Sequence, residues 1–281
     1  MNEIEPQEEQ GGGLKQRLPA IAGIQAPESK ARLLLSSLGI VALVIGLYFM
    51  LIDIAYWLPE KYGDTFLDLA GPLEGLPAEG IWTVQAILLR ILACGLCLLL
   101  IYGFFKLFHN RRLRLPFRRI TAEQKSVMYK HIVFYFLVLA GINLLFSFTA
   151  LGELVAEGSE PESIEVGWLG QLVFFSFIVI VGPLFEEILF RGFLHKRLRL
   201  AFSFWPAFLV SGLVFSALHF VPGEPLSYNL YGIGSTLVFS YFVTKTFEAT
   251  DNIWTAFIFH GLYNGWVMLW MFVENAFTSF A

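Results

Sequence analysis

The feature that most constrains the fold is a series of apolar runs that are too long for a soluble domain to bury. One of them, WLGQLVFFSFIVIVGPLFEEILF at residues 168–190, contains only two charged residues. Several runs exceed the 18 or so apolar residues at which a transmembrane helix becomes the default expectation. Only 15% of the 281 residues are charged, against about 25% in soluble proteins. The sequence therefore predicts an all-α, polytopic membrane protein.

The hydropathy pattern predicts about seven transmembrane helices. The sixth is the weakest of them, because Gly232 and Gly234 interrupt it. The predicted ranges are 33–57, 81–108, 131–152, 168–194, 203–221, 229–246 and 253–275.

The loops between these helices alternate in charge, which predicts an orientation. Segment 106–119 holds six Lys and Arg residues and no acid, whereas segment 153–166 holds five Glu residues and no base. The segment HKRLR after the fourth helix is basic again. Positive loops stay in the cytoplasm, so we expect a cytoplasmic N-terminus and an outer C-terminus.

We expect three segments along the chain. Residues 1–32 form a flexible polar tail, since they have too few apolar groups to offset the entropy of ordering. Residues 33–152 form N-terminal transmembrane helices without a motif, and residues 153–281 form a catalytic transmembrane core. The basic residues border the helices instead of forming a patch on a soluble domain, which argues against nucleic-acid binding.

The fourth predicted helix carries three ionisable residues inside its apolar run. Glu187 and Arg191 are four residues apart, with the acid on the N-terminal side, which is the favourable order for an ion pair within a helix. Glu186 is rotated by about 100° from Glu187 and points elsewhere. Glu186 therefore needs a partner from another helix, because an isolated charge inside a membrane is costly.

Two later helices carry polar pairs at the same spacing. Phe215 and His219 share a helix face in FSALH, and His260 and Asn264 share one in HGLYN. His219, His260 and Asn264 are the candidate partners of Glu186. A single polar group of this kind is usually just a hydrogen bond between helices, but four of them beside an ion pair indicate a site.

These motifs, EEILFR, FSALH and HGLYN in this order, resemble those of the CAAX-protease and bacteriocin-processing (CPBP) family of intramembrane endopeptidases. The resemblance covers roughly residues 165–275. It implies hydrolysis of a peptide bond in a membrane-associated or peptide substrate within the lipid bilayer.

The resemblance also implies roles for individual residues. Glu186 would be the general base that activates a water, and His219 would help to hold that water. His260 and Asn264 would stabilise the oxyanion. Glu187 and Arg191 would form a supporting pair, with Phe215 as the remaining motif residue.

A zinc mechanism is the alternative. Glu186, His219 and His260 could bind Zn²⁺ as a His₂Glu site with one open position. However, HExxH is absent, and a zinc enzyme would still need a separate base. The sequence favours a glutamate mechanism without a metal or other cofactor.

A non-proteolytic protein is the second alternative, either a proton-coupled transporter or a binding scaffold for bacteriocin immunity. Glutamate and histidine chains inside membranes also mark proton pathways. The short loops favour a bacterial cytoplasmic membrane for either function.

Some polar residues fall outside these motifs. His195 lies in a basic segment and is expected to be solvated, and Arg90 has no assigned role, although it could pair with Asp53. Cys94 and Cys97 lie within an apolar helix, where cysteine behaves as a small hydrophobic residue.

Overall fold

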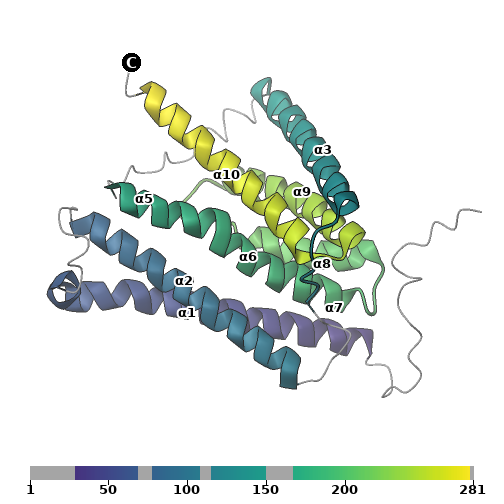
Figure 1. Ribbon diagram of the computed structural model, residues 1–281, viewed down its shortest axis with the longest axis horizontal. Coiled ribbons are helices and arrows are strands. Elements are labelled where there is room, and N and C mark those ends of the chain that lie inside the picture. Colours follow the sequence, from purple (N-terminus) through teal and green to yellow (C-terminus); the bar gives the residue numbers. More distant parts are fainter. Residues whose placement is uncertain (1–28, 69–77, 108–114, 150–166, 279–281) are drawn as a thin grey trace, which may run out of the picture.

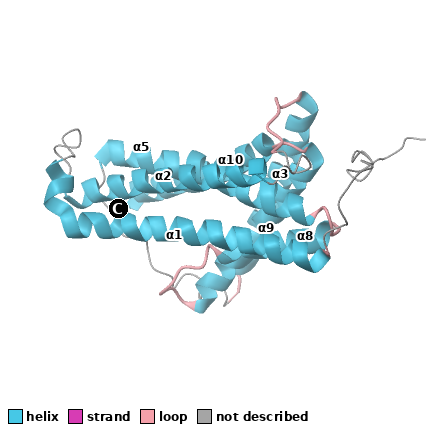
Figure 2. Cartoon of the chain, turned by 90° about the horizontal axis from the view of Figure 1, so that it is seen from below, coloured by secondary structure: helices cyan, strands magenta, loops and turns pink. Residues whose placement is uncertain are grey.

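A computed structural model describes residues 29–68, 78–107, 115–149 and 167–278. No strand occurs in these ranges, so the predicted all-α class is confirmed for them. The helices form long rods, some of which are nearly parallel to their neighbours while others cross them (Figures 1 and 2). Residues 1–28, most of the predicted tail, and the acidic segment 153–166 lie outside the described residues.

The described residues form seven helical rods close to the predicted positions. The fourth rod is continuous but changes between α- and π-helical hydrogen bonding along its length. The rods are α1 (Lys30–Asp68), α2 (Ala78–Leu107), α3 (Ala122–Ser147), the fourth rod, α8 (Phe204–Ala217), α9 (Leu226–Thr250) and α10 (Ile253–Thr278). The fourth rod consists of α5 (Gly167–Ser176), η4 (Phe177–Val181), α6 (Gly182–Glu187), η5 (Ile188–His195) and α7 (Lys196–Leu198).

Five of the seven rods are long and apolar enough to cross a membrane. The two others are α8, which has 14 residues, and α9, which is the predicted sixth helix with its two glycines. At 1.5 Å per residue α8 is about 21 Å long, less than the roughly 30 Å of a hydrocarbon core. Seven complete crossings and a cytoplasmic N-terminus therefore stay predictions.

The fourth rod lies at the centre of the molecule. On one side it contacts the pair α1 and α2, and on the other it contacts α8 and α10 (Figure 1). α9 packs between α3 and α8, and α3 lies on the outside of the bundle. The central position explains why the side chains of η5 are buried from Ile188 to His195.

α3 begins nine residues earlier than the sequence analysis predicted. Thr121 and Gln124 form a capping box, in which each side chain accepts a hydrogen bond from the backbone N–H of the other residue. The Gln124 amide also donates to the Thr250 carbonyl at 2.8 Å, which ties α3 to the end of α9. The Thr-x-x-Gln pattern was readable in the sequence, but the polar residues after it obscured the start of the helix.

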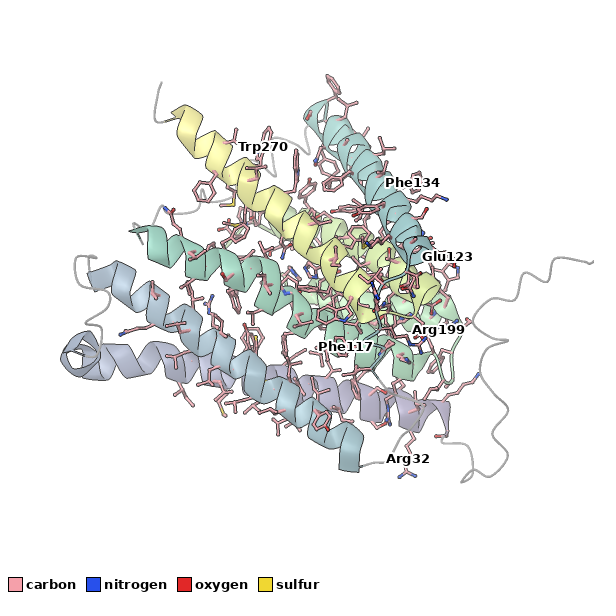
Figure 3. All side chains as sticks on the ribbon, in the orientation of Figure 1. Arg32, Phe117, Glu123, Phe134, Arg199 and Trp270 are labelled. Carbon is pink, nitrogen blue, oxygen red and sulfur yellow. The ribbon has the colours of Figure 1, made fainter. Side chains whose placement is uncertain are left out.

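The basic segments meet at one end of the molecule. Asp251, in the turn between α9 and α10, forms ion pairs with Arg118 at 3.2 Å and with Lys196 at 3.3 Å. Figure 3 shows Arg32, Glu123 and Arg199 at this same end and Trp270 toward the other. The described parts of these basic segments thus gather at one end of the molecule, and the side of the membrane that this end faces stays a prediction.

Candidate active site

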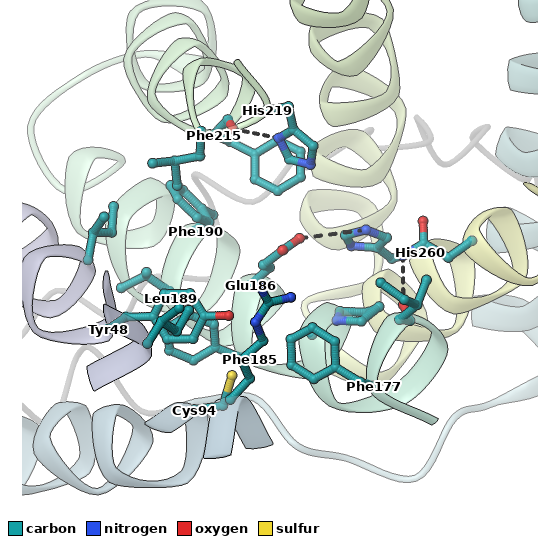
Figure 4. A pocket seen from close by; sticks show the side chains of 18 of the residues that line it. Tyr48, Cys94, Phe177, Phe185, Glu186, Leu189, Phe190, Phe215, His219 and His260 are labelled. Atoms are coloured by element: carbon teal, nitrogen blue, oxygen red, sulfur yellow. Dashed lines mark hydrogen bonds and ion pairs between the residues drawn. The ribbon is translucent and has the colours of Figure 1, made fainter. Parts of the chain in front are cut away.

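The predicted site residues from three separate rods line one cavity of about 500 Å³ (Figure 4). Glu186 comes from α6, His219 from the turn after α8, and His260 and Asn264 from α10. Phe215 also lines this cavity, whereas Glu187 and Arg191 are not among its lining residues. The structure thus places polar groups of all three motifs on one cavity.

Glu187 and Arg191 form the predicted ion pair. Nη1 of Arg191 donates to Oε1 of Glu187 at 2.9 Å, and the two side chains are only 1% and 0% exposed. Nη2 of Arg191 donates to the Ser240 hydroxyl on α9 at 3.1 Å. A buried charge requires such partners, because removing it from water costs several kcal/mol.

Phe215 supports this pair from α8. Its ring centroid lies 4.5 Å from the Arg191 guanidinium carbon, a cation–π contact that is strengthened by desolvation. The same ring lies 4.9 Å from the His219 ring. Phe215 of the second motif therefore contacts both Arg191 of the first motif and His219 of the second.

Glu187 has a second partner that the sequence analysis did not predict. Nδ1 of His260 lies 2.8 Å from the same Oε1 atom. A carboxylate accepts hydrogen bonds, so Nδ1 carries the proton and the imidazole ring is fixed in orientation. Nε2 of His260 then lies 3.7 Å from Oε2 of Glu186. His260 therefore stands between the two glutamates, and its direct hydrogen bond is to Glu187.

Glu186 has a different environment from its neighbour. Its side chain is 31% exposed, and Figure 4 shows its carboxylate directed toward His260, with His219 above both. The 3.7 Å separation from His260 is longer than a direct hydrogen bond. A water or a substrate oxygen could bridge a gap of this size.

His219 reaches the cavity because α8 is short. The helix ends at Ala217, and the chain turns at His219 before the loop that leads to α9. Nδ1 of His219 lies 3.0 Å from the Phe215 carbonyl, which can only accept a hydrogen bond, so the neutral ring leaves Nε2 as an acceptor.

The loop after His219 is held by Asn229. Its amide accepts from the Val221 backbone N–H at 2.7 Å and donates to the Val221 carbonyl at 3.0 Å. It is also within 3.2 Å of the Glu224 carbonyl. These bonds satisfy backbone groups of the irregular segment between α8 and α9. The sequence alone does not distinguish Asn229 from an ordinary polar residue in a helix.

Asn264 connects α10 to the π-helical segment η4. Its amide donates to the Ile178 carbonyl at 2.8 Å. In η4 the backbone bonds run from residue i to i−5, as from Gly182 to Phe177. The next donor would be Pro183, which has no N–H, so the Ile178 carbonyl lacks its helical partner. Asn264 supplies the missing hydrogen bond and retains a second amide hydrogen.

The alternative zinc ligands do not form a metal-binding cluster. Among the described residues, no group of three or more His, Cys, Asp or Glu side chains is arranged to hold a metal ion. Nδ1 of His260 is already bonded to Glu187, and its Nε2 is 3.7 Å from the Glu186 carboxylate. Two donors on one tetrahedral zinc lie roughly 3.3–3.6 Å apart, so the 3.7 Å between these two atoms does not itself exclude a shared metal, and the metal-free mechanism stays a prediction.

His195 is the clearest correction to the sequence analysis. The residue is 1% exposed, not solvated. Its Nε2 lies 2.9 Å from the Glu248 carboxylate on α9, and its Nδ1 lies 3.3 Å from the Ser211 hydroxyl on α8. Arg199 also binds Glu248. His195 therefore joins three rods at the basic end, away from the cavity. Its basic neighbours in sequence concealed its burial.

Both cysteines are free and buried, as their apolar surroundings predicted. The Cys97 thiol lies 3.7 Å from the Val44 carbonyl on α1. Cys94 lines the cavity wall next to Tyr48. The sequence analysis did not anticipate that α1 and α2 would contribute to this wall.

Comparison with known proteins agrees with the motifs. Residues 168–266 match the model of the family described as type II CAAX prenyl endopeptidase Rce1-like. Residues 168–266 are a CAAX prenyl endopeptidase family domain. The domain contains all three motifs and excludes α1, α2 and α3. No curated protein and no solved structure gave a significant match.

The family domain and the apolar helices together define the general class of the protein. The CAAX endopeptidase domain implies a protease with a peptide substrate. The five long apolar helices imply a protein that passes through a membrane several times.

Proposed function

We propose that this protein is an intramembrane endopeptidase in which Glu186 activates the attacking water. One observation carries the proposal. Among the described residues that line the cavity, Glu186 is the only acid, and it faces His260 across 3.7 Å. Its neighbour Glu187 is fully buried and bonded to Arg191 and His260, so it is not accessible to a water in the cavity.

The hydrogen bonds give the two histidines different roles. His219 uses its Nδ1 proton on the Phe215 carbonyl, so its Nε2 can accept a hydrogen bond from the water. The Glu187 carboxylate at Nδ1 fixes the orientation of the His260 ring, and Nε2 of that ring points toward Glu186. With a proton on both ring nitrogens, Nε2 donates a hydrogen bond to the developing oxyanion. Asn264 contributes its second amide hydrogen.

The reaction then has two proton transfers. Glu186 takes a proton from the water as its oxygen attacks the scissile carbonyl carbon, and negative charge develops on the carbonyl oxygen. His260 and Asn264 stabilise that charge, an effect worth roughly 2.7–4 kcal/mol per donor in other enzymes. Glu186 returns the proton to the leaving amine as the C–N bond breaks.

The test is cleavage of a peptide library by the full chain purified into lipid nanodiscs. Glu186→Gln keeps the shape of the side chain but removes the base, so cleavage should fall by at least about 100-fold. Glu224→Gln is the matched control, because Glu224 lies in the loop after α8 and does not line the cavity. Normal turnover by the Glu186 variant would overturn the proposal.

A chelator separates the proposed mechanism from the zinc alternative. We expect activity to persist in excess chelator, with well under one zinc per active chain by elemental analysis. The reason is that Glu186 would have to serve as both ligand and base, and zinc enzymes usually divide these two roles. Stoichiometric zinc, with activity lost on stripping and restored by adding it back, would make Glu186, His219 and His260 the ligands.

The same preparation tests the transporter alternative. Substrate flux that depends on a proton gradient, without any cleaved product, would favour a transporter over a protease. A bacterial cytoplasmic membrane stays a prediction from the short loops.

A further inference from the structure

Part of the cavity wall comes from helices that lie outside the CAAX endopeptidase domain. α1 contributes Tyr48 and Ile52, and α2 contributes Arg90 and Cys94. The family match begins only at residue 168. The motif residues of the site thus belong to the endopeptidase domain. The wall formed by α1 and α2 lies outside the domain and can determine which substrate fits.

Arg90 is the basic residue on this wall. It lies six residues into the apolar span Val84–Gly103, about 9 Å along the helix from the start of that span. Its side chain is partly exposed and lines the cavity. A charged residue at such depth is costly and is a functional candidate by default.

Arg90 and Glu186 lie on the same cavity but on different helices. Tyr48 lines the same cavity, and its hydroxyl is hydrogen-bonded with the Cys94 thiol. Most of the remaining lining residues are apolar, among them Phe49, Phe177 and Val267. The cavity thus offers a water-activating carboxylate, an apolar surface and a separate cation.

We propose that Arg90 binds a carboxylate of the peptide substrate and so selects peptides that carry a negative charge near the scissile bond. This inference rests on the proposed endopeptidase function. The guanidinium group is planar and offers two parallel donors that match a carboxylate. In a cavity with apolar walls such a pair is much stronger than in water.

The size of the cavity limits where that carboxylate can be. A volume of about 500 Å³ accommodates a ligand of drug size, so only a few residues of the substrate fit. The carboxylate must therefore belong to a residue close to the bond that is cut. It is either the free C-terminus of the peptide or an Asp or Glu side chain, and both present the same chemistry to Arg90.

The arginine also offsets a repulsion. A substrate carboxylate that enters this cavity approaches the Glu186 carboxylate, and two like charges in a low dielectric repel strongly. A cation on a separate wall lowers the energy of the bound substrate and holds its charge away from the base. Arg90 thereby acts on substrate binding and not on the chemical step.

The experiment uses the full chain in nanodiscs and a mixed peptide library with free C-termini. Wild-type protein identifies a cleaved peptide by mass spectrometry, with Glu186→Gln as the inactive control. That peptide is then made with a free C-terminus, with a C-terminal amide, and with each nearby Asp or Glu changed to Asn or Gln. KM and kcat are measured for each version.

We expect Arg90→Gln to raise KM at least about 10-fold for the carboxylate peptide and to change kcat little. It should have almost no effect on the version that lacks the relevant carboxylate, and Arg90→Lys should recover part of the loss. The peptide change that raises the KM of wild-type protein shows whether the relevant carboxylate is the C-terminus or a side chain.

Asp53→Asn is the matched control, because the sequence offers Asp53 as an ion-pair partner for Arg90. If Arg90 served only that pair, Asp53→Asn would reproduce the effect of Arg90→Gln, and the inference would be wrong. If Arg90→Gln does not fold, the test uses wild-type protein alone. Its KM should then be at least about 10-fold lower for the peptide with the carboxylate than for the version without it.

The other outcomes are also decisive. Equal KM values of wild-type protein for all peptide versions would overturn the role of Arg90 and leave the endopeptidase function intact. No cleavage of any library peptide by wild-type protein would overturn the proposed function, and the inference would fail with it.

Discussion

At the scale of single residues, the site depends on two adjacent glutamates that have opposite environments. The side chain of Glu186 is 31% exposed and faces the cavity, whereas that of Glu187 is 0% exposed and accepts from both Arg191 and His260. The helical rotation of about 100° between neighbours produces this division. One carboxylate is therefore available to water while the other organises the site.

Glu187→Ala should destabilise the protein strongly, and Glu186→Ala should not. Removing Glu187 leaves the buried Arg191 charge without its carboxylate and His260 without its acceptor, and breaking a buried pair costs about 3–5 kcal/mol. Removing Glu186 deletes a partly exposed carboxylate from the cavity. Thermal unfolding of both variants in the same detergent measures the difference. Equal midpoints would contradict the division of roles.

At the scale of elements, the position of His260 depends on how closely α10 approaches η4. A Cβ atom on Gly261 would lie 2.8 Å from the Val179 carbonyl oxygen, a distance that side chains essentially never reach. The Asn264 hydrogen bond to Ile178 joins the same two segments one turn further along. The π-helical segment therefore presents its carbonyls to α10 and sets the depth of His260.

Gly261→Ala should separate α10 from η4 and reduce both stability and activity. Because the clash is with backbone, which moves less easily than a side chain, the cost should be about 1–3 kcal/mol. The displacement of His260 should lower kcat more than it raises KM. Gly265→Ala is the control on the same helix, since a Cβ there meets nothing within 4 Å. Gly→Ala improves helix propensity, so Gly265→Ala should keep or slightly raise stability. Comparable losses in both variants would show that the close approach at Gly261 does not explain the effect.

At the scale of the whole molecule, the cavity is assembled between the endopeptidase domain and the N-terminal pair of helices. Arg118 and Lys196 both pair with Asp251 at the basic end, while large apolar side chains of α3 and α10 face outward. Examples on α3 are Phe134, Leu137 and Leu145. An outward apolar surface of this kind suits contact with lipid acyl chains.

The charge pattern predicts which side of the membrane each segment faces. A cysteine introduced at Arg118 should be labelled by an impermeant thiol reagent only from the cytoplasm, and one placed in 157–163 only from outside. The native Cys94 and Cys97 are 1% and 0% exposed, so they should give little background. Labelling of both positions from the same side would mean that the number of crossings between them is wrong.

The sequence determined the helices and the residue pairs within each helix because both depend on local spacing. Apolar runs predicted the seven rods, and intervals of four residues predicted the Glu187–Arg191 pair and the shared face of His260 and Asn264. The motif order predicted the family domain. The Thr121 capping box was also readable locally, although the polar start of α3 obscured it.

Only the tertiary structure decided which groups meet across helices. The hydrogen bond from His260 to Glu187, the burial of His195 against Glu248 and the entry of Arg90 into the cavity wall all join residues distant in the chain. The early end of α8 at Ala217 likewise depends on the loop that Asn229 stabilises. A periodicity gives the face on which a side chain lies, but the packing of neighbouring rods determines what that face contacts.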